Sequence, residues 1–245
     1  MMGRTHALTG CAAGLAVAPL AGVDNLANVA VFAVICGGWA LVPDLDHPQS
    51  SATRLLGPVT RALSAGLRAA TGAFYRATKG PRDEEGTHRT VTHTALWAIC
   101  VGLLLGWLGT ISPWTTVGVA VFGVLLAADR LGRWLLLAPL GLVLLWAGTG
   151  MTPAAMLDTV GGLSWAVGVA AGLGCLVHTC GDMITKSGAP LIFPVVIRGE
   201  SYYEVRPPRF LRFRTGGKVE NWLVTPLCFL ALAALAIPAV ANALI

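Results

Sequence analysis

Charged side chains are scarce in this sequence of 245 residues: Asp, Glu, Lys and Arg make up 12% of it, against 55% hydrophobic residues. Soluble domains carry about twice that charged fraction. The mean hydropathy is +0.71, and several apolar runs approach the roughly 17–25 residues that a helix needs to cross a bilayer. A soluble protein of this composition would have to bury almost every helix on all sides, so we predict an integral membrane protein.

Paired cysteines are also lacking, since none of the six cysteines belongs to a Cys-x-x-Cys pair. This argues against a disulfide framework and against a thiolate zinc site. All of them lie in or at the ends of apolar runs, where we expect them to act as small apolar residues inside helices. They are Cys11, Cys36, Cys100, Cys175, Cys180 and Cys228.

The apolar runs predict an all-α, polytopic protein with about seven membrane-spanning helices. We expect residues 1–245 to form one integral membrane domain. A loop is expected at 150–159, between the fifth and sixth helices. The predicted helices cover 7–23, 26–42, 93–111, 113–128, 134–148, 160–180 and 222–241.

Two longer polar segments separate these runs, at 43–92 and 182–221. The first contains an amphipathic stretch at 51–78, predicted as one helix, in which Arg54, Arg61, Arg68 and Arg76 share a face. Such a helix either lies on an anionic lipid surface or packs against the protein. The second segment is too rich in Pro and Gly for one helix, and 202–205 and 210–213 are expected to pair as short strands.

Basic residues are confined to the segments on one side of the predicted spans. Residues 1–6, 43–92, 129–133 and 182–221 together contain all 17 Lys and Arg. Positive residues mark the cytoplasmic side of a membrane protein. We therefore predict a cytoplasmic N-terminus, cytoplasmic polar segments and a C-terminus outside. The pI of about 9.1 reflects this topology, and no nucleic-acid motif is present.

Histidines gather in short clusters at the ends of apolar runs. Pro43-Asp44-Leu45-Asp46-His47 follows one run, His88-Arg89-Thr90-Val91-Thr92-His93 precedes another, and His178-Thr179-Cys180-Gly181-Asp182 closes a third. The clusters hold four of the five histidines, and His6 stands just before the first run. The predicted topology places them all on one face, so we expect one metal site at the membrane edge.

Imidazoles mixed with carboxylates suit Zn²⁺ best, with Mn²⁺ or Fe²⁺ as alternatives, and suit Ca²⁺ less. A cap at Thr90 or Thr92 would start the third helix and let His88 turn back toward the centre. Because the candidates outnumber the ligands of one tetrahedral ion, two ions are an alternative, and some residues would then orient ligands instead. The predicted ligands are Asp46, His88, His93, His178 and Asp182 first, with His6 and His47 as further members.

Asp44 is the predicted general base, although it could also be a ligand. Arg89 is predicted to hold an anionic group, above all a phosphate. Thr92, Thr185 and Lys186 are expected to help bind the substrate.

In these motifs the sequence resembles the YdjM-type family of bacterial inner-membrane proteins, described as membrane-bound metal-dependent hydrolases. The family pattern has an early His, then Pro-Asp-x-Asp-His, His-Arg-x-x-Thr-His and His-x-x-x-Asp followed by Thr, Gly and Pro. In this sequence the early His corresponds to His6, the next three elements to the three clusters, and the final Thr, Gly and Pro to Thr185, Gly188 and Pro194. In addition, Phe213-Arg214-Thr215-Gly216 with Glu220 resembles a late Arg-x-Gly…Glu element of the family. The sequence departs from the pattern in a long insert between its second and third elements, which suggests a lid or a lipid-docking helix.

The resemblance implies a membrane relative of zinc-dependent phospholipase C and of P1-type single-strand nucleases. It implies hydrolysis of a phosphoester by a metal-activated water. We therefore predict an enzyme that acts at the cytoplasmic face of the bacterial inner membrane, on a phospholipid or another phosphoester. The sequence specifies neither the substrate nor the oligomeric state.

Other functions would use the same residues differently or require features that the sequence lacks. A metal-binding sensor or scaffold would use the same ligands without turnover. A transporter is disfavoured, because the apolar runs carry no ionisable residue between their ends. Glu84-Glu85-Gly86-Thr87-His88-Arg89 fits the pattern of intramembrane prenyl-protein proteases, but it stands in a polar loop rather than in a membrane helix.

Overall fold

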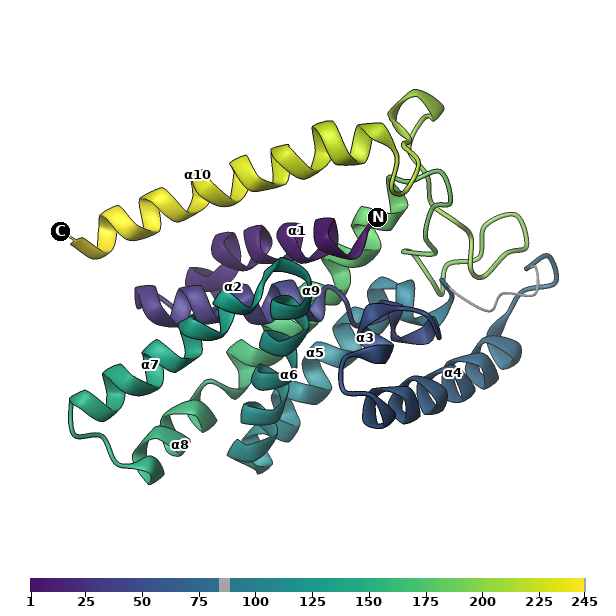
Figure 1. The fold of residues 1–245 in the computed structure, drawn as a ribbon. Helices are drawn as coiled ribbons and strands as arrows, with labels where there is room; N and C mark the ends of the chain where they lie inside the picture. Colours follow the sequence, from purple (N-terminus) through teal and green to yellow (C-terminus); the bar gives the residue numbers. More distant parts are fainter. Residues whose placement is uncertain (84–88, 245) are drawn as a thin grey trace.

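A computed structural model describes residues 1–83 and 89–244, and this part of the chain is mainly helical, with a long irregular segment between Met183 and Glu220 (Figure 1). Within it the only β contacts are isolated bridges, so the all-α prediction is confirmed there. The α-helices are α1 (Gly3–Val17), α2 (Leu26–Trp39), α3 (Ser51–Arg54), α4 (Pro58–Thr78), α5 (Ala95–Ile111), α6 (Pro113–Leu131), α7 (Leu137–Gly148), α8 (Pro153–Gly162), α9 (Ser164–Met183) and α10 (Thr225–Leu244). The short 3₁₀-helices are η1 (Ala18–Ala21), η2 (Pro43–Asp46), η3 (Val91–His93), η4 (Arg133–Leu136) and η5 (Arg209–Leu211). A short π-helix, η6 (Glu220–Val224), leads into α10.

Each predicted apolar run forms a helix, and among the described residues 4 segments are long and apolar enough to cross a membrane. The apolar helices Ala95–Ile111 and Arg133–Gly148 are shorter. The 4 longer segments are Leu26–Asp46, Pro113–Leu131, Ser164–Met183 and Glu220–Ile237. The figure of about seven crossings stays a prediction.

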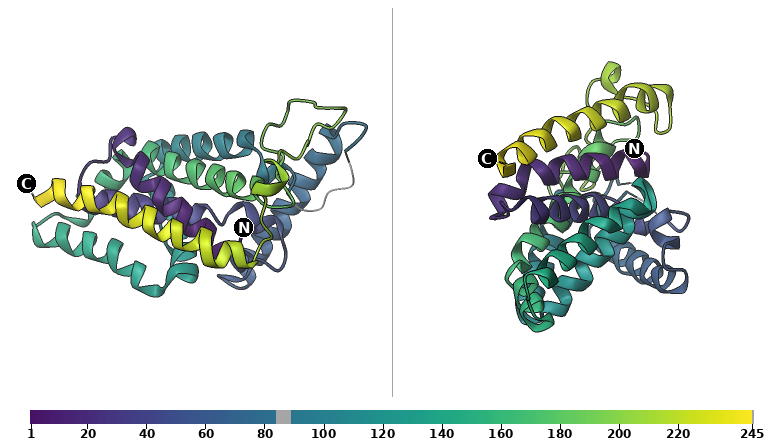
Figure 2. Two further views of the ribbon diagram at one scale, coloured as in Figure 1. Left: turned by 90° about the horizontal axis from the view of Figure 1, so that it is seen from above. Right: turned by 60° about the vertical axis from the view of Figure 1, so that its left-hand side comes forward.

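The polar parts of the chain gather at one end of the helix bundle. The N-terminus, α3, α4 and the irregular segment between α9 and α10 lie toward this end in Figures 1 and 2. The C-terminus and the connection between α7 and α8 lie toward the opposite end in the same views. The described parts of the three histidine clusters (43–47, 89–93 and 178–182) belong to this polar end, because each stands at the end of a helix that reaches it.

Helix α2 forms the centre of the bundle, in contact with α1, α6 and α9. Its packing on α6 depends on small residues, since a Cβ at Gly38 would overlap the carbonyl of Gly123. Beside them the indole of Trp39 donates a hydrogen bond to the carbonyl of Val119 at 3.0 Å. This pair of helices therefore tolerates no added volume at Gly38, and the end of α2 is held firmly where the first Asp cluster begins.

The amphipathic stretch is two helices rather than the predicted single one. Helix α3 ends at Arg54, and α4 begins at Pro58, after Gly57 with a φ of 59°. Pro58 explains the break, because its ring and missing N–H are tolerated only in the first turn of a helix. The positive φ at Gly57 favours a residue without a Cβ.

The expected loop at 150–159 is wrong, because α8 covers Pro153–Gly162. Thr152 accepts a hydrogen bond from the N–H of Ala155 at 3.3 Å, and Pro153 occupies the first turn. A threonine cap followed by proline is a signature of a helix start. The sixth predicted helix accordingly begins at Ser164 rather than at 160.

The expected hairpin between 202–205 and 210–213 is also wrong. Val205 forms its bridge with Ala189, and Phe213 forms its bridge with Thr185. Both segments thus line up with the chain that follows α9 instead of with each other. Pro207 and Pro208 separate them, and η5 occupies part of the second segment.

A second, aromatic core ties α4 to this irregular segment. Tyr202 stacks on Phe193 with ring centroids 4.5 Å apart. The ring centroid of Tyr75, on α4, lies 4.6 Å from that of Tyr202. Burial raises the pKa of Tyr202, whose hydroxyl pairs with that of Thr78 at 2.8 Å. Asp83 adds to the link, because its carboxylate accepts the N–H of Gly80, Ser201 and Tyr202.

The packing of α2 on α6 yields a test of the fold. Gly38→Ala is expected to destabilise the protein by about 1–3 kcal/mol, because the added methyl must displace backbone in a filled contact. The matched control is Gly118→Ala on α6, where a Cβ meets nothing within 4 Å, and alanine there should be neutral or stabilising by up to about 1 kcal/mol. Thermal unfolding in detergent would measure both, and equal midpoints for the two variants would contradict this packing.

Candidate metal centre

The predicted clusters come together where four helical elements meet at the polar end. Turn η2 follows α2 and carries Asp44 and Asp46, while η3 precedes α5 and carries His93. The last turns of α9 carry His178 and Asp182. His6 joins them from the first turns of α1, which begins at Gly3, earlier than the first apolar run indicated.

The His178 ring is fixed by the end of α2. Its side chain is fully buried, and Nδ1 lies 2.7 Å from the carbonyl oxygen of Ala40. A carbonyl can only accept, so Nδ1 donates its proton and Nε2 presents a lone pair. Ala40 is the C-cap of α2, where helix carbonyls lack an intrahelical partner. The end of one helix therefore sets the tautomer of a histidine on another.

The His93 ring is fixed in the same sense by a short relay. The Thr92 hydroxyl donates to Asp46 Oδ2 at 2.7 Å, and its oxygen lies 2.9 Å from His93 Nδ1. Because the hydroxyl proton goes to the carboxylate, Nδ1 of His93 donates to the threonine oxygen. Nε2 of His93 then also presents a lone pair. A carboxylate behind an imidazole is the usual outer partner of a metal-binding histidine.

The Nε2 atoms of His93 and His178 lie 3.1 Å apart. If each ring carries only its Nδ1 proton, the two lone pairs repel each other unless a metal ion lies close to both, whereas one added proton would make the contact a hydrogen bond. Asp44 Oδ1 lies 3.8 and 3.6 Å from these two nitrogens, and Asp182 Oδ2 lies 3.7 Å from both. Tetrahedral bonds of about 2.0–2.1 Å place ligand atoms about 3.4 Å apart. Five of the six distances among these four atoms therefore lie at 3.1–3.8 Å, close to the spacing in a tetrahedral N₂O₂ donor set.

His6 forms a second overlapping group with His178 and Asp182. Its ring stacks on that of His178, with centroids 3.8 Å apart and planes 17° apart. Both ring nitrogens of His6 are buried without a hydrogen-bond partner in the described structure, although Nε2 lies 3.3 Å from Asp182 Oδ1. The two oxygens of Asp182 thus face different histidines, as in a carboxylate that bridges two ions.

Cationic groups surround Asp182. The guanidinium of Arg89 donates from Nε to Asp182 Oδ2 at 2.9 Å, and the amino group of Met1 contacts Oδ1. Arg89 has a φ of 58°, a left-handed conformation that costs an L-residue roughly 1–2 kcal/mol. Its Nη1 is buried and has no hydrogen-bond partner in the part of the chain described here.

Side-chain hydroxyls of α3 and α4 donate hydrogen bonds to backbone carbonyls in the turn between Asp44 and His47. Ser64 of α4 donates to the carbonyl of Leu45 at 2.6 Å, and Thr53 of α3 donates to that of His47 at 2.9 Å. The amphipathic segment is therefore attached directly to the chain that presents the carboxylates.

The other predicted residues lie in different surroundings. His47 is half-buried, accepts the N–H of Gln49 at 3.2 Å, and lies outside both candidate metal groups in the described structure. Thr185 donates to the carbonyl of Asp182 at 2.7 Å, and Lys186 is exposed. The helix cap is Thr94, which accepts the N–H of Trp97 at 3.0 Å, so the expected cap at Thr90 or Thr92 is wrong. His88, and with it Glu84 and Glu85, lies outside the described residues.

Glu220 received no role from the residue pattern alone, yet it is fully buried near this end. Its two carboxylate oxygens accept the N–H of Met2 at 2.6 Å and of Gly216 at 2.7 Å. It thereby fastens the start of the last helix to the start of α1. Two signals in the sequence pointed to it: its match to the late Arg-x-Gly…Glu element of the family pattern and its place as an acidic residue at the start of an apolar run.

Comparison with known protein families shows to which family the chain belongs. The sequence model of the YdjM inner membrane protein family matches residues 1–243, nearly the whole chain. The chain belongs to this family. Together with its long apolar helices, membership identifies an inner membrane protein. No curated protein and no solved structure matches the chain, so the likeness to phospholipase C and P1-type nucleases stays a prediction.

The donor set leads to a test of metal binding. We expect purified protein to carry zinc near one ion per chain or above, because two imidazoles and two carboxylates suit Zn²⁺. His178→Ala should lose it, since that residue belongs to both candidate groups, whereas His47→Ala should keep it. Elemental mass spectrometry of the folded proteins would decide, and loss in His47→Ala with retention in His178→Ala would contradict this geometry.

The relay behind His93 leads to a second test. Asp46→Asn should keep the zinc stoichiometry but raise the zinc Kd about 10–100-fold, because it weakens an outer partner rather than a ligand. Asp158→Asn, an exposed position on α8, is the matched control and should leave the Kd unchanged. Competition with a chelating dye would measure both. Complete loss of zinc in Asp46→Asn would make Asp46 a ligand instead.

Proposed function

We propose that this chain is a metal-dependent hydrolase that acts on phosphoesters of membrane lipids at the polar end of its helix bundle. The observation that carries the proposal is the approach of two histidine Nε2 atoms to 3.1 Å, with each Nδ1 directed to another partner. Both nitrogens also lie 3.6–3.8 Å from carboxylate oxygens of Asp44 and Asp182, and imidazoles gathered with carboxylates in this way are typical of a site for a divalent metal ion.

His93, His178, Asp44 and Asp182 would hold the ion, and Zn²⁺ fits this set best, with Mn²⁺ or Fe²⁺ as alternatives. When bound, such an ion polarises a phosphoryl oxygen and makes water more acidic. This assignment makes Asp44 a ligand, whereas Asp46 supports the ligand His93 through Thr92. The sequence had favoured Asp46 as the ligand and Asp44 as the base. A second ion near His6 would share Asp182.

The open side of the centre is defined by two residues. Both histidines are fully buried, whereas the Asp44 side chain is 27% exposed and that of Arg89 is 18% exposed. A substrate therefore approaches between Asp44 and Arg89. The Nη1 of Arg89, which has no hydrogen-bond partner among the described residues, is suited to a phosphate oxygen, because a guanidinium binds phosphate through several parallel N–H groups. Because Asp44 would be a ligand, its predicted role as a free general base is not part of this proposal.

Several features support a lipid rather than a soluble phosphoester. Helix α4 leaves Val59, Leu63 and Phe74 exposed while Arg61 and Arg68 are also exposed, as expected for a helix at an anionic lipid surface. It is attached to the turn that carries the carboxylates. We place this end in the cytoplasm, with about seven crossings and the C-terminus outside, because the basic residues all fall on that side.

Hydrolysis by zinc-loaded protein in mixed micelles tests the proposal. Phosphatidic acid offers a phosphomonoester and phosphatidylglycerol a phosphodiester, and we expect turnover of at least one. His178→Ala should abolish turnover with loss of zinc. Arg89→Ala should keep zinc but lower kcat/KM by about 10²–10³, the usual cost of removing a group that stabilises transition-state charge.

Arg133→Ala is the matched control, because Arg133 is exposed at the short turn before α7. It should turn over substrate at the wild-type rate. Equal rates in the two arginine variants would remove Arg89 from the mechanism. Stoichiometric zinc without turnover of either lipid would contradict the hydrolase and favour a metal-binding sensor or scaffold.

A further inference from the structure

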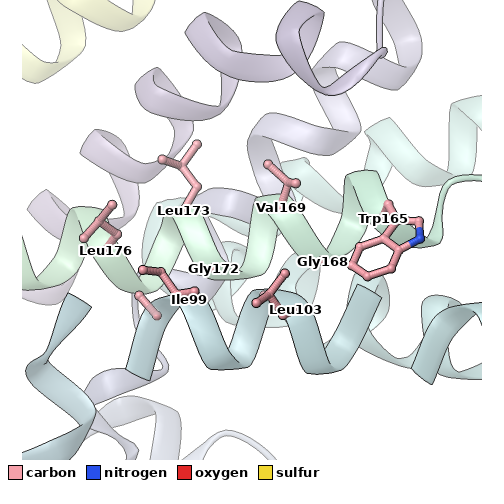
Figure 3. A pocket seen from close by; sticks show the side chains of 10 residues that line it. Ile99, Leu103, Trp165, Gly168, Val169, Gly172, Leu173 and Leu176 are labelled. Atoms are coloured by element: carbon pink, nitrogen blue, oxygen red, sulfur yellow. The ribbon is translucent and has the colours of Figure 1, made fainter. Parts of the chain in front are cut away.

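An apolar groove runs along the outer side of the bundle between α5 and α9 (Figure 3). Its volume is about 240 Å³, and every residue that lines it is apolar. Ile99 and Leu103 stand on α5, while Val169, Leu173 and Leu176 stand on α9, with Trp165 at one end (Figure 3). Ile99, Leu103, Trp165 and Val169 are each at least 42% exposed, so the groove opens to the surroundings of the bundle.

The groove exists because glycines draw the two helices together. A Cβ at Gly172 would lie 2.9 Å from the carbonyl oxygen of Ala98 and 3.1 Å from the Cα of Gly102. A Cβ at Gly168 would lie 2.7 Å from the Cα of Gly106. Because the two backbones are in such close contact at the glycines, the larger side chains on either side of the contact project outward. The space between these two rows of side chains is the groove.

The length and direction of the groove match one leaflet of a bilayer. From Trp165 to Leu176 the helix rises about 16 Å, and half of a hydrocarbon core is about 15 Å. The Leu176 end lies beside His178 in α9, and Ala98 at the start of α5 lies shortly after His93. Trp165 lies at the far end. The groove thus extends from the depth of the hydrocarbon to the helix ends that carry the metal ligands.

We propose that the groove binds one hydrocarbon chain of an anionic lipid whose phosphate lies at Arg89. This inference rests on the proposed function and assigns the substrate's chain to a definite site. The apolar lining offers no partner for a headgroup or a peptide, while the buried Nη1 of Arg89, without a partner in the described residues, offers one for phosphate. A chain bound along α5 and α9 would hold its own phosphate within reach of the centre and restrict its orientation there.

Photolabelling in lipid nanodiscs tests the groove without requiring turnover. The probe is phosphatidic acid with a diazirine on one acyl chain, diluted into phosphatidylcholine. Peptide mapping should find most label within 98–103 and 165–176. Excess unlabelled phosphatidic acid should reduce that label about tenfold, as expected for displacement from a defined site, whereas added phosphatidylcholine should not.

Two matched variants separate the groove from other apolar surface. Val169→Trp should fill the groove and reduce its label about tenfold, with zinc content and elution volume unchanged. Val143→Trp, on α7 at a similarly exposed valine (47% against 42%), should leave the label unchanged. Label spread evenly over α7, α9 and α10, or insensitive to phosphatidic acid, would overturn the inference and leave only general lipid contact.

The result also separates the inference from the function it rests on. Competed label in the groove without hydrolysis would support the chain site and contradict the hydrolase. Hydrolysis with evenly spread label would support the hydrolase and overturn the chain site.

Discussion

The approach of His93 Nε2 to His178 Nε2 is the constraint on which the rest of the polar end depends. Each ring is held from behind, one by the carbonyl at the end of α2 and the other by the relay through Thr92 to Asp46. Neither ring can turn away without leaving a buried donor without a partner, which costs about 1–3 kcal/mol. The two Nε2 atoms are therefore held toward each other at 3.1 Å, and a metal ion close to both would bind them together with the neighbouring carboxylates.

The same constraint explains the charges around Asp182. This carboxylate stands in the last turn of α9, where the partial negative charge of the helix end disfavours it. Arg89, His6 and the amino group of Met1 all contact it, and the candidate ion would add to them. Arg89 adopts a left-handed backbone to reach it, and residues held in such conformations cluster at functional sites. The candidate metal site and the proposed anion site would thus share a single carboxylate.

Much of this arrangement follows from the sequence. The apolar runs, the confinement of Lys and Arg to alternate segments, and the histidine clusters at run ends predicted a helical membrane protein with its ligands at one end. Those signals are local and periodic, so they can be recognised in the sequence alone. The choice between Asp44 and Asp46 cannot be made in this way, because both precede the same histidine, His47. Only the fold of the turn decides which carboxylate faces Nε2 of His93 and which faces its Nδ1.

Other features needed the structure for similar reasons. His6 stands near the chain start, and its entry into α1 depends on packing against α9 rather than on propensity. The break before Pro58 and the start of α8 at Pro153 both agree with proline chemistry, but the spacing of the arginines at 51–78 favours a single helix there. The groove between α5 and α9 has no signal in either helix alone, since it arises where the glycines of one meet the backbone of the other.

The most direct measurement is anomalous diffraction at the zinc edge from crystals of the zinc-loaded protein. The account predicts a peak between His93 Nε2 and His178 Nε2, with Asp44 and Asp182 at bonding distance of about 2.0–2.2 Å. A peak bound instead by Asp46 and His47, or by cysteine, would contradict it, as would the absence of any peak at the two imidazoles.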